Sequence, residues 1–178
     1  VDTSAVGIYT LAYNVSDDSG NAATSVIRTV VVQDTSAPVI TLLGDTSMTL
    51  EVGDTFTDAG ATATDAVDDD QTLTANIVVT GSVNTDAVGI YTLTYTLSDA
   101  AGNAAKSVTR TVVVQDTVIP VIILLGDASM TLEVGDIFTD LGATASDAVD
   151  GVLTDEIVVT GSVDASAVGT YTLTYNVK

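Results

Sequence analysis

Aspartate and asparagine gather in a few short loops of this chain, and their oxygen atoms are the groups best suited to chemistry. Ca²⁺ takes about six to eight hard oxygen ligands in flexible geometry, which such loops supply together with backbone carbonyls. The twelve-residue EF-hand loop with its terminal Glu is absent. The residues that we single out as metal ligands are Asp34, Asp65, Asp68, Asp99, Asn103, Asp116, Asp147, Asp150, Asp17 and Asn21.

The same residues also have a purely local explanation. Asp, Asn and Gly favour turns, because their side chains bond the nearby backbone or because they tolerate left-handed φ. On this interpretation, the segment from Asp99 to Asn103 is only a tight hairpin turn, and we assign Asp54, Asp58 and Asp86 to turns as well. For the acidic loops, calcium ligation and turn formation both stay open.

The amino-acid composition lacks the residue types that most often carry catalysis. The chain has no His and no Cys, which removes the common general base and the strongest nucleophile. No glycine-rich phosphate loop is present, and we expect no enzyme. With 24 acidic and 4 basic residues, the formal charge is −20. We therefore expect no nucleic-acid partner, because binding nucleic acid requires Lys and Arg, and no membrane insertion, because no apolar run approaches the length of a membrane span.

The elements that must position these loops come in repeats. The segment Val1–Thr10 returns as Val83–Thr92 and again as Val163–Thr172, and Pro38–Asp45 returns as Pro120–Asp127. The period of roughly 80 residues is that of small domains strung in tandem, not of a stacked solenoid. We expect a complete repeat at 37–116, a C-terminal part (strands F and G) at 1–36 and an N-terminal part (strands A to F) at 117–178, cut from a longer protein.

Strand periodicity is clear within the complete repeat. Tyr91–Leu97 alternates Tyr or Leu with Thr, the period-2 pattern of a strand with one buried face. By this alternation every Tyr of the chain falls on the buried side, and no stretch has convincing helical periodicity. The further predicted strands are Val108–Gln115, Val39–Leu43, Met48–Val52, Ala61–Thr64 and Ile77–Val83. The fold class is therefore all-β, and short strands with turns at this spacing predict a β-sandwich, of the tandem immunoglobulin-like type that the features below indicate.

A Gly-x-Tyr at the start of the best strand narrows the sandwich. In immunoglobulin-like domains, a Tyr at the start of strand F can form a tyrosine corner, in which its hydroxyl bonds back to the preceding loop. Tyr9, Tyr91 and Tyr171 occupy this position in the three copies.

Three strings carry a family resemblance that covers essentially the whole chain: TLEVGDTFTDAGATATDAVD, VGIYTLTYTLSDAAGNAAKSVTRTVVVQD and PVITLLGD. They resemble the immunoglobulin-like tandem repeats of large bacterial surface proteins, akin to hyaline-repeat modules. The resemblance implies an extracellular protein, at the bacterial cell surface or secreted. It also implies a stalk or spacer of an adhesin, or a component of a surface filament.

In the immunoglobulin-like strand order, the acidic loops converge. The linker at Asp34, the loop after strand B (which ends near Thr64) and the loop after strand F (which ends near Ser98) reach the same end of the domain. The next junction repeats this arrangement with Asp116, Asp147 and Asp150. Ca²⁺ bound there would tie each linker to the loops of the next repeat and make the array a stiff rod.

Alternatives to a spacer stay open. Exposed loops or a Thr-rich sheet face could bind a glycan or a protein, although the chain has no Trp. The partners that we expect are neighbouring repeats of the same chain, together with other copies through strand addition at sheet edges or a surface glycan or protein.

Overall fold

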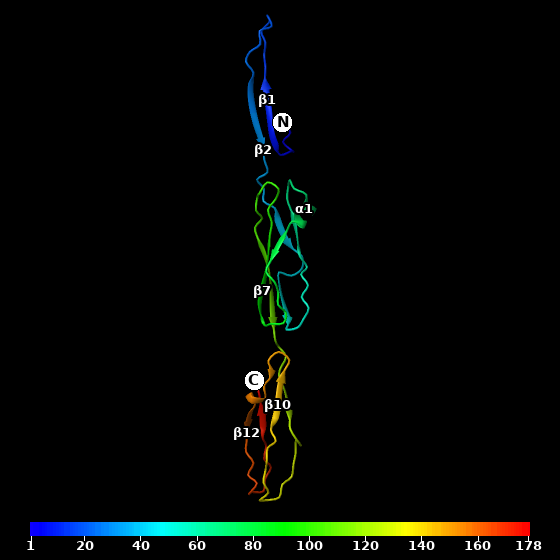
Figure 1. Ribbon diagram of the computed structural model, residues 1–178, viewed down its shortest axis with the longest axis vertical. Helices are drawn as coiled ribbons and strands as arrows, with labels where there is room; N and C mark the ends of the chain where they lie inside the picture. The colour runs from blue at the N-terminus through cyan, green and yellow to red at the C-terminus, as the bar shows by residue number, and fades with distance from the viewer. The chain divides into compact units, whose positions relative to one another are not determined.

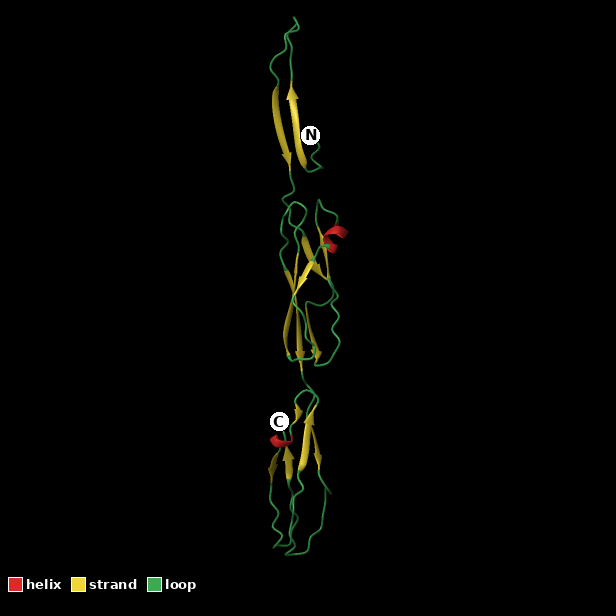
Figure 2. Cartoon of the chain, in the orientation of Figure 1, coloured by secondary structure: helices red, strands yellow, loops and turns green.

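The computed structural model describes all residues, 1–178, and divides into two compact units. The first unit comprises Val1–Leu50 and Asp54–Val114, and the second comprises Glu51–Gly53 and Gln115–Lys178. Strands dominate both units, with one short helix in each (Figure 2). The elements of the first unit are β1 (Gly7–Tyr13), β2 (Val26–Val32), β3 (Val39–Leu42), β4 (Ser47–Glu51), β5 (Ala61–Thr64), α1 (Asp70–Ala75), β6 (Val78–Thr80), β7 (Gly89–Thr96) and β8 (Val108–Gln115), of which β4 and β8 end in the second unit. Those of the second are β9 (Val121–Leu124), β10 (Ala143–Asp147), β11 (Gly151–Val152), the 3₁₀ turn η1 (Thr154–Glu156), β12 (Val158–Thr160) and β13 (Thr174–Asn176).

The predicted all-β sandwich is confirmed in the complete repeat (Figure 1). One sheet pairs β3 with β5, and the other has the order β4-β8-β7-β6. β7 and β8 form an antiparallel hairpin from Gly89 opposite Val114 to Tyr95 opposite Val108. The main hydrophobic cluster between the two sheets consists of Ile40, Ala63, Leu73, Leu93, Tyr95 and Leu97, and Val112 and Val114 of β8 are buried as well. The Leu and Tyr side chains of the alternating pattern, Leu93 and Tyr95 in β7, therefore point into the core as predicted.

The tyrosine corner is confirmed in all three copies. The hydroxyl of Tyr91 donates to the carbonyl of Ala87 at 2.9 Å, Tyr9 donates to Ala5 at 2.9 Å, and Tyr171 donates to Ala167 at 3.1 Å. A Cβ at Gly89 would lie 3.3 Å from the Tyr91 ring, tighter than an ordinary van der Waals contact. The Gly-x-Tyr spacing thus reflects a close approach of backbone and ring.

Two local features differ from the sequence expectation. The helix α1 was not predicted, because six residues are too few to show helical periodicity; Asp69 caps it by accepting a bond from the Thr72 amide. The predicted strand Ile77–Val83 shrinks to β6, Val78–Thr80. The following residue, Gly81, has φ +98°, and a Cβ there would lie 2.2 Å from the Thr92 carbonyl oxygen, so the chain leaves the extended path at this point.

The expectation that every Tyr is buried is wrong for the partial repeats. Tyr95 is fully buried, but Tyr13 is 52% exposed and Tyr171 is 38% exposed. In the complete repeat, β3 and β5 cover the inner face of β7. The β1–β2 hairpin pairs only with itself, and β13 pairs only with β12, so their equivalent side chains remain uncovered.

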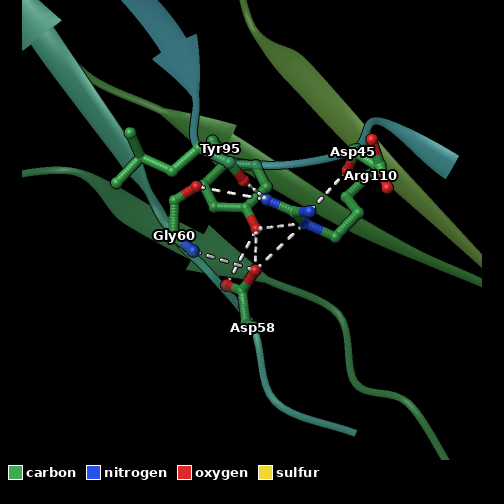
Figure 3. A network of polar contacts seen from close by, with 6 residues as sticks. Asp45, Asp58, Gly60, Tyr95 and Arg110 are labelled. Atoms are coloured by element: carbon green, nitrogen blue, oxygen red, sulfur yellow. Dashed lines mark hydrogen bonds and ion pairs between the residues drawn. The ribbon is translucent and has the colours of Figure 1, made fainter. Parts of the chain in front are cut away.

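A buried polar network crosses the core of the complete repeat. Arg110 lies on the inward face of β8 with 2% exposure, and its Nε is 3.0 Å from Asp58 Oδ1 (Figure 3). Its Nη2 donates to the carbonyls of Leu43, at 2.6 Å, and Gly60, at 3.2 Å, and Nη1 donates to the carbonyl of Asp45.

Tyr95 and Asp58 complete this network. The Tyr95 hydroxyl donates to both carboxylate oxygens of Asp58, at 2.7 and 2.8 Å. Asp58 Oδ1 also accepts the Gly60 amide at 3.1 Å. The sequence analysis assigned Asp58 only to a turn, but in the structure Asp58 is also the counter-ion of the buried Arg110.

Replacing Arg110 by Met is expected to lower the free energy of unfolding by about 3 kcal/mol, because it leaves Asp58 without its cation and takes the guanidinium donors away from the carbonyls of Leu43 and Asp45. Arg28→Met is the matched control: Arg28 occupies the corresponding position on β2 but is exposed. That change is expected to alter stability by less than about 0.5 kcal/mol. Urea unfolding followed by the amide resonances of β7 and β8 measures both, and equal effects of the two substitutions would contradict the assignment.

Candidate functional site

Two clusters of three carboxylates form at the ends of the loops that the sequence singles out. Asp34, Asp68 and Asp99 make the first cluster, and Asp116, Asp147 and Asp150 make the second. Within each cluster, one carboxylate oxygen from every residue lies within 4.8 Å of the others. The convergence of a linker residue with loop residues of the repeat that follows it is therefore present in the structure.

The two clusters draw on equivalent places in the fold. Asp34 lies between β2 and β3, and Asp116 lies between β8 and β9. Asp68 follows β5, and Asp150 follows β10. The third member differs: in the first cluster it is Asp99, after β7, and in the second it is Asp147, at the end of β10.

Turn formation accounts for part of this arrangement. Asp34 Oδ1 accepts the Ser36 amide at 2.9 Å, and Asp116 Oδ1 accepts the Val118 amide at 3.0 Å. Asp99 accepts the backbone amide of Asn103 at 2.7 Å. The local explanation is thus correct for these oxygens, and it fixes where the carboxylates stand.

One carboxylate oxygen in each cluster is left over. Asp34 Oδ2 and Asp147 Oδ2 are buried side-chain atoms without a hydrogen-bond partner, and no other side-chain atom of the chain shares this state. The other oxygen of Asp147, Oδ1, accepts a hydrogen bond from the Val149 amide at 2.7 Å. Buried polar atoms are nearly always paired, so each of these oxygens requires an explanation. A cation held among the three carboxylates would supply it.

The first cluster is also electrostatically strained. Burial raises the pKa of the Asp68 carboxyl, and the charges of Asp99, Asp34 and Asp65 raise it further. For Asp99, burial likewise acts upward, but hydrogen bonds from the side chain and backbone of Asn103 outweigh it and lower the pKa. Three carboxylates of like charge lie together in this cluster, which is the environment that a divalent cation relieves.

The remaining predicted ligands lie outside the two groups of three convergent carboxylates. Asp65 Oδ1 accepts the Val67 amide at 2.9 Å, and its charge acts on Asp68 without joining the three convergent carboxylates. The Nδ2 of Asn103 donates to Asp99 Oδ2 at 2.8 Å and to the Asp34 carbonyl at 3.4 Å. Asn103 therefore joins the linker to the loop after β7 as a donor.

Asp17 and Asn21 repeat the turn of Asp99 and Asn103 in the first hairpin. Asp17 accepts the backbone and side-chain amides of Asn21, both at 2.8 Å. These bonds lower the pKa of Asp17. Neither residue belongs to a carboxylate cluster.

Sequence reasoning missed one residue that touches a linker. Glu51, the last residue of β4, accepts hydrogen bonds from Gln115 and Thr117 on both sides of Asp116. An isolated Glu at the end of a strand gives no sign of a partner more than 60 positions away. The only signal was that Ser47–Asp54 returns unchanged as Ser129–Asp136.

The chain was compared with protein families and with known proteins. The sequence model for the family described as "Bacterial surface protein, Ig-like domain" matches residues 1–32, 40–114 and 122–178. An uncharacterized 81.3 kDa protein of Acholeplasma phage L2 is 31% identical over 182 residues, covering 96% of this chain and 24% of that protein. Hyalin of Strongylocentrotus purpuratus is 30% identical over 155 residues, covering 84% of this chain and 13% of hyalin.

Two further matches are more partial. Hyalin of Lytechinus variegatus is 30% identical over 138 residues, covering 75% of this chain and 26% of that protein. A solved lipoprotein structure from Bacteroides thetaiotaomicron matches with 33% identity and a TM-score of 0.40, covering 46% of this chain and 39% of that chain. This chain thus spans between 13% and 26% of the length of these curated relatives.

Replacing Asp68 by Asn is expected to raise the melting temperature in metal-free buffer at about pH 7. With a raised pKa, the fold favours the neutral carboxyl, so its stabilising contribution is present below the ordinary value of 3.8 and is lost as the pH rises through the raised one. Asn keeps the shape without the charge, so the gain should vanish at about pH 3. Calorimetry measures it against Asp18→Asn, which removes a charge from an exposed turn; a lower melting temperature for Asp68→Asn at neutral pH would contradict the electrostatic account.

Proposed function

This chain belongs to the family of Ig-like domains of bacterial surface proteins, and we propose that it is a stalk or spacer segment of a long extracellular protein such as an adhesin or a surface filament. It is an extracellular surface repeat by family. No helix of the chain is both long enough and apolar enough to cross a bilayer. The repeated domain carries length and spacing, and its role is structural, not catalytic.

The observation that carries the mechanism is the buried, unpaired carboxylate oxygen in each cluster. We propose that Ca²⁺ binds there, with one carboxylate from the linker and two from the repeat that follows. Carboxylates are the hard oxygen ligands that Ca²⁺ prefers, and carbonyls and water complete its shell. The ion removes the repulsion within the cluster and ties Asp34 or Asp116 to the adjacent loops.

This arrangement converts cation binding into linker stiffness. Without the ion, three like charges favour an open linker. With the ion, the linker residue and the loops become ligands of one centre, so the linker loses its freedom to bend. A stalk built from many such repeats would hold its outer end away from the cell only while the centres are filled.

A second candidate function is lateral pairing between copies through β6 and β12, each of which lies at an edge of its sheet. β6 is the terminal strand of its sheet, and Val78 and Val79 are 55% and 45% exposed. Ile77–Val83 is identical to Ile157–Val163 and carries no charge, in a chain of formal charge −20. Edge strands present unpaired backbone groups to other chains, and an uncharged edge lacks the usual protection against such pairing.

Removing Ca²⁺ is expected to lower the melting temperature and to shorten the mean end-to-end distance of the chain. At a free Ca²⁺ concentration 100 times the dissociation constant, each filled site would stabilise the fold by about 2.7 kcal/mol. Calorimetry and small-angle scattering with and without a chelator test this, and Asp34→Asn combined with Asp116→Asn should remove the response. Asp86→Asn is the control for loss of a carboxylate, and identical curves with and without Ca²⁺ would rule out the cation role.

Placing a Lys at both Val79 and Val159 is expected to abolish self-association, because a charge at the strand edge opposes pairing. Sedimentation velocity over a concentration series measures the effect. Ile90→Lys, at an exposed position of β7 away from the edge, should leave association unchanged. A wild-type chain that remains monomeric throughout the series would exclude this second function.

A further inference from the structure

We propose that Glu51 is a positioning residue for the second carboxylate cluster, holding the linker 115–117 so that Asp116 is presented to Asp147 and Asp150. The inference rests on the cation function proposed above, but it concerns a residue outside both clusters. Glu51, the linker and the second cluster all lie within the second compact unit.

Both carboxylate oxygens of Glu51 bind the linker. Oε1 accepts the Thr117 hydroxyl at 2.8 Å and the Gln115 side-chain amide at 3.2 Å. Oε2 accepts the backbone amide of Thr117 at 3.0 Å. The Val52 amide adds a backbone bond to the Gln115 carbonyl at 2.9 Å. Asp116 is therefore bracketed by two residues that are both fixed to the end of β4.

The protonation state of Glu51 suits this role. Hydrogen bonds from the Thr117 hydroxyl, the Gln115 amide and the Thr117 backbone lower the pKa of Glu51. The carboxylate is therefore ionised at neutral pH and is available as a charged acceptor, which makes stronger hydrogen bonds than a neutral one.

Holding the neighbours of a ligand improves metal binding because less freedom is lost when the ion arrives. Asp116 supplies one of the three carboxylates, and its own Oδ1 bond to the Val118 amide orients only its side chain. Glu51 holds the backbone amide of Thr117 after Asp116, and the neighbouring Val52 amide holds the carbonyl of Gln115 before it. Residues that orient ligands from outside the metal shell typically change affinity by about 10- to 100-fold when they are removed. For an exposed bracket we expect the lower end of this range.

The chain supplies matched controls. Glu133 is the counterpart of Glu51 in the third repeat, within the identical segment Ser129–Asp136, so Glu133→Ala removes the same side chain elsewhere. Thr117→Val removes the hydroxyl donor and keeps the side-chain shape, whereas Thr117→Ser restores the hydroxyl. The first cluster, whose linker residue is Asp34, reports whether an effect is specific to the second.

The experiment is a Ca²⁺ titration of the full chain by NMR. The amides of 147–152 report the second cluster and those of 65–70 report the first, and hydrogen exchange of the Thr117 amide is measured in chelator. For Glu51→Ala we expect about tenfold weaker Ca²⁺ binding at the second cluster, an unchanged first cluster and faster Thr117 exchange. Thr117→Val should show the same direction of change, Thr117→Ser should behave like wild type, and Glu133→Ala should have no effect.

The outcomes separate this inference from the cation function. If wild type binds Ca²⁺ at both clusters and Glu51→Ala binds it equally well, the positioning role of Glu51 is overturned while the cation function stands. If wild type binds Ca²⁺ at neither cluster, the cation function falls and the role of Glu51 in presenting a ligand falls with it. In that case, faster Thr117 exchange in Glu51→Ala would still show that Glu51 holds the linker, and unchanged exchange would remove that contact too.

Discussion

The buried guanidinium of Arg110 is the constraint on which the complete repeat depends. A charge on the inward face of a central strand must be paired, because an unpaired one would destabilise the core by several kcal/mol. Its partners are Asp58 and the carbonyls of Leu43, Asp45 and Gly60, which flank β3 and β5. One side chain of β8 thus fixes one end of the opposite two-stranded sheet, where Leu43 and Gly60 also share a backbone bond of 2.9 Å.

The carboxylate cluster lies at the other end of that same sheet. β3 and β5 are antiparallel, with Val39 opposite Thr64 and Leu42 opposite Ala61. The residues after β3 and before β5 meet at the Arg110 end, so the linker before β3 and the acidic loop after β5 meet at the far end. The short two-stranded sheet therefore places Asp34 and Asp68 together while the arginine network holds its opposite edge. The buried arginine network and the carboxylate cluster thus lie at opposite ends of the β3–β5 sheet.

The partial repeats show that this network is assembled from separable pairs. In the third repeat, Tyr175 donates to Asp140 at 2.5 Å, and Asp140 also accepts the Gly142 amide at 2.8 Å, as Tyr95, Asp58 and Gly60 do in the complete repeat. In the first hairpin, Arg28 lies 5.8 Å from the centre of the Tyr13 ring. The Asp–Tyr pair joins a turn to a strand in both repeats, and in the complete repeat Arg110 extends it to the carbonyls of Leu43 and Asp45.

Sequence reasoning succeeded where a pattern is local or is repeated. The alternation around Tyr91 predicts β7, Gly89-x-Tyr91 predicts the corner, and strand order predicts which acidic loops meet. It failed where the partners of an interaction are far apart in the sequence, as in the ion pair of Asp58 with Arg110 and the hydrogen bond of Glu51 with Thr117. A signal for the first pair was present, since Arg110 alternates with Val108, Val112 and Val114 in the inward row of β8.

A turn bond and a free carboxylate oxygen can belong to the same side chain. Asp34 and Asp147 each use one oxygen to accept a backbone amide and leave the other buried and unpaired. The turn bond orients the carboxylate and leaves the other oxygen free, so the turn and the proposed cation ligand do not compete for the same atom.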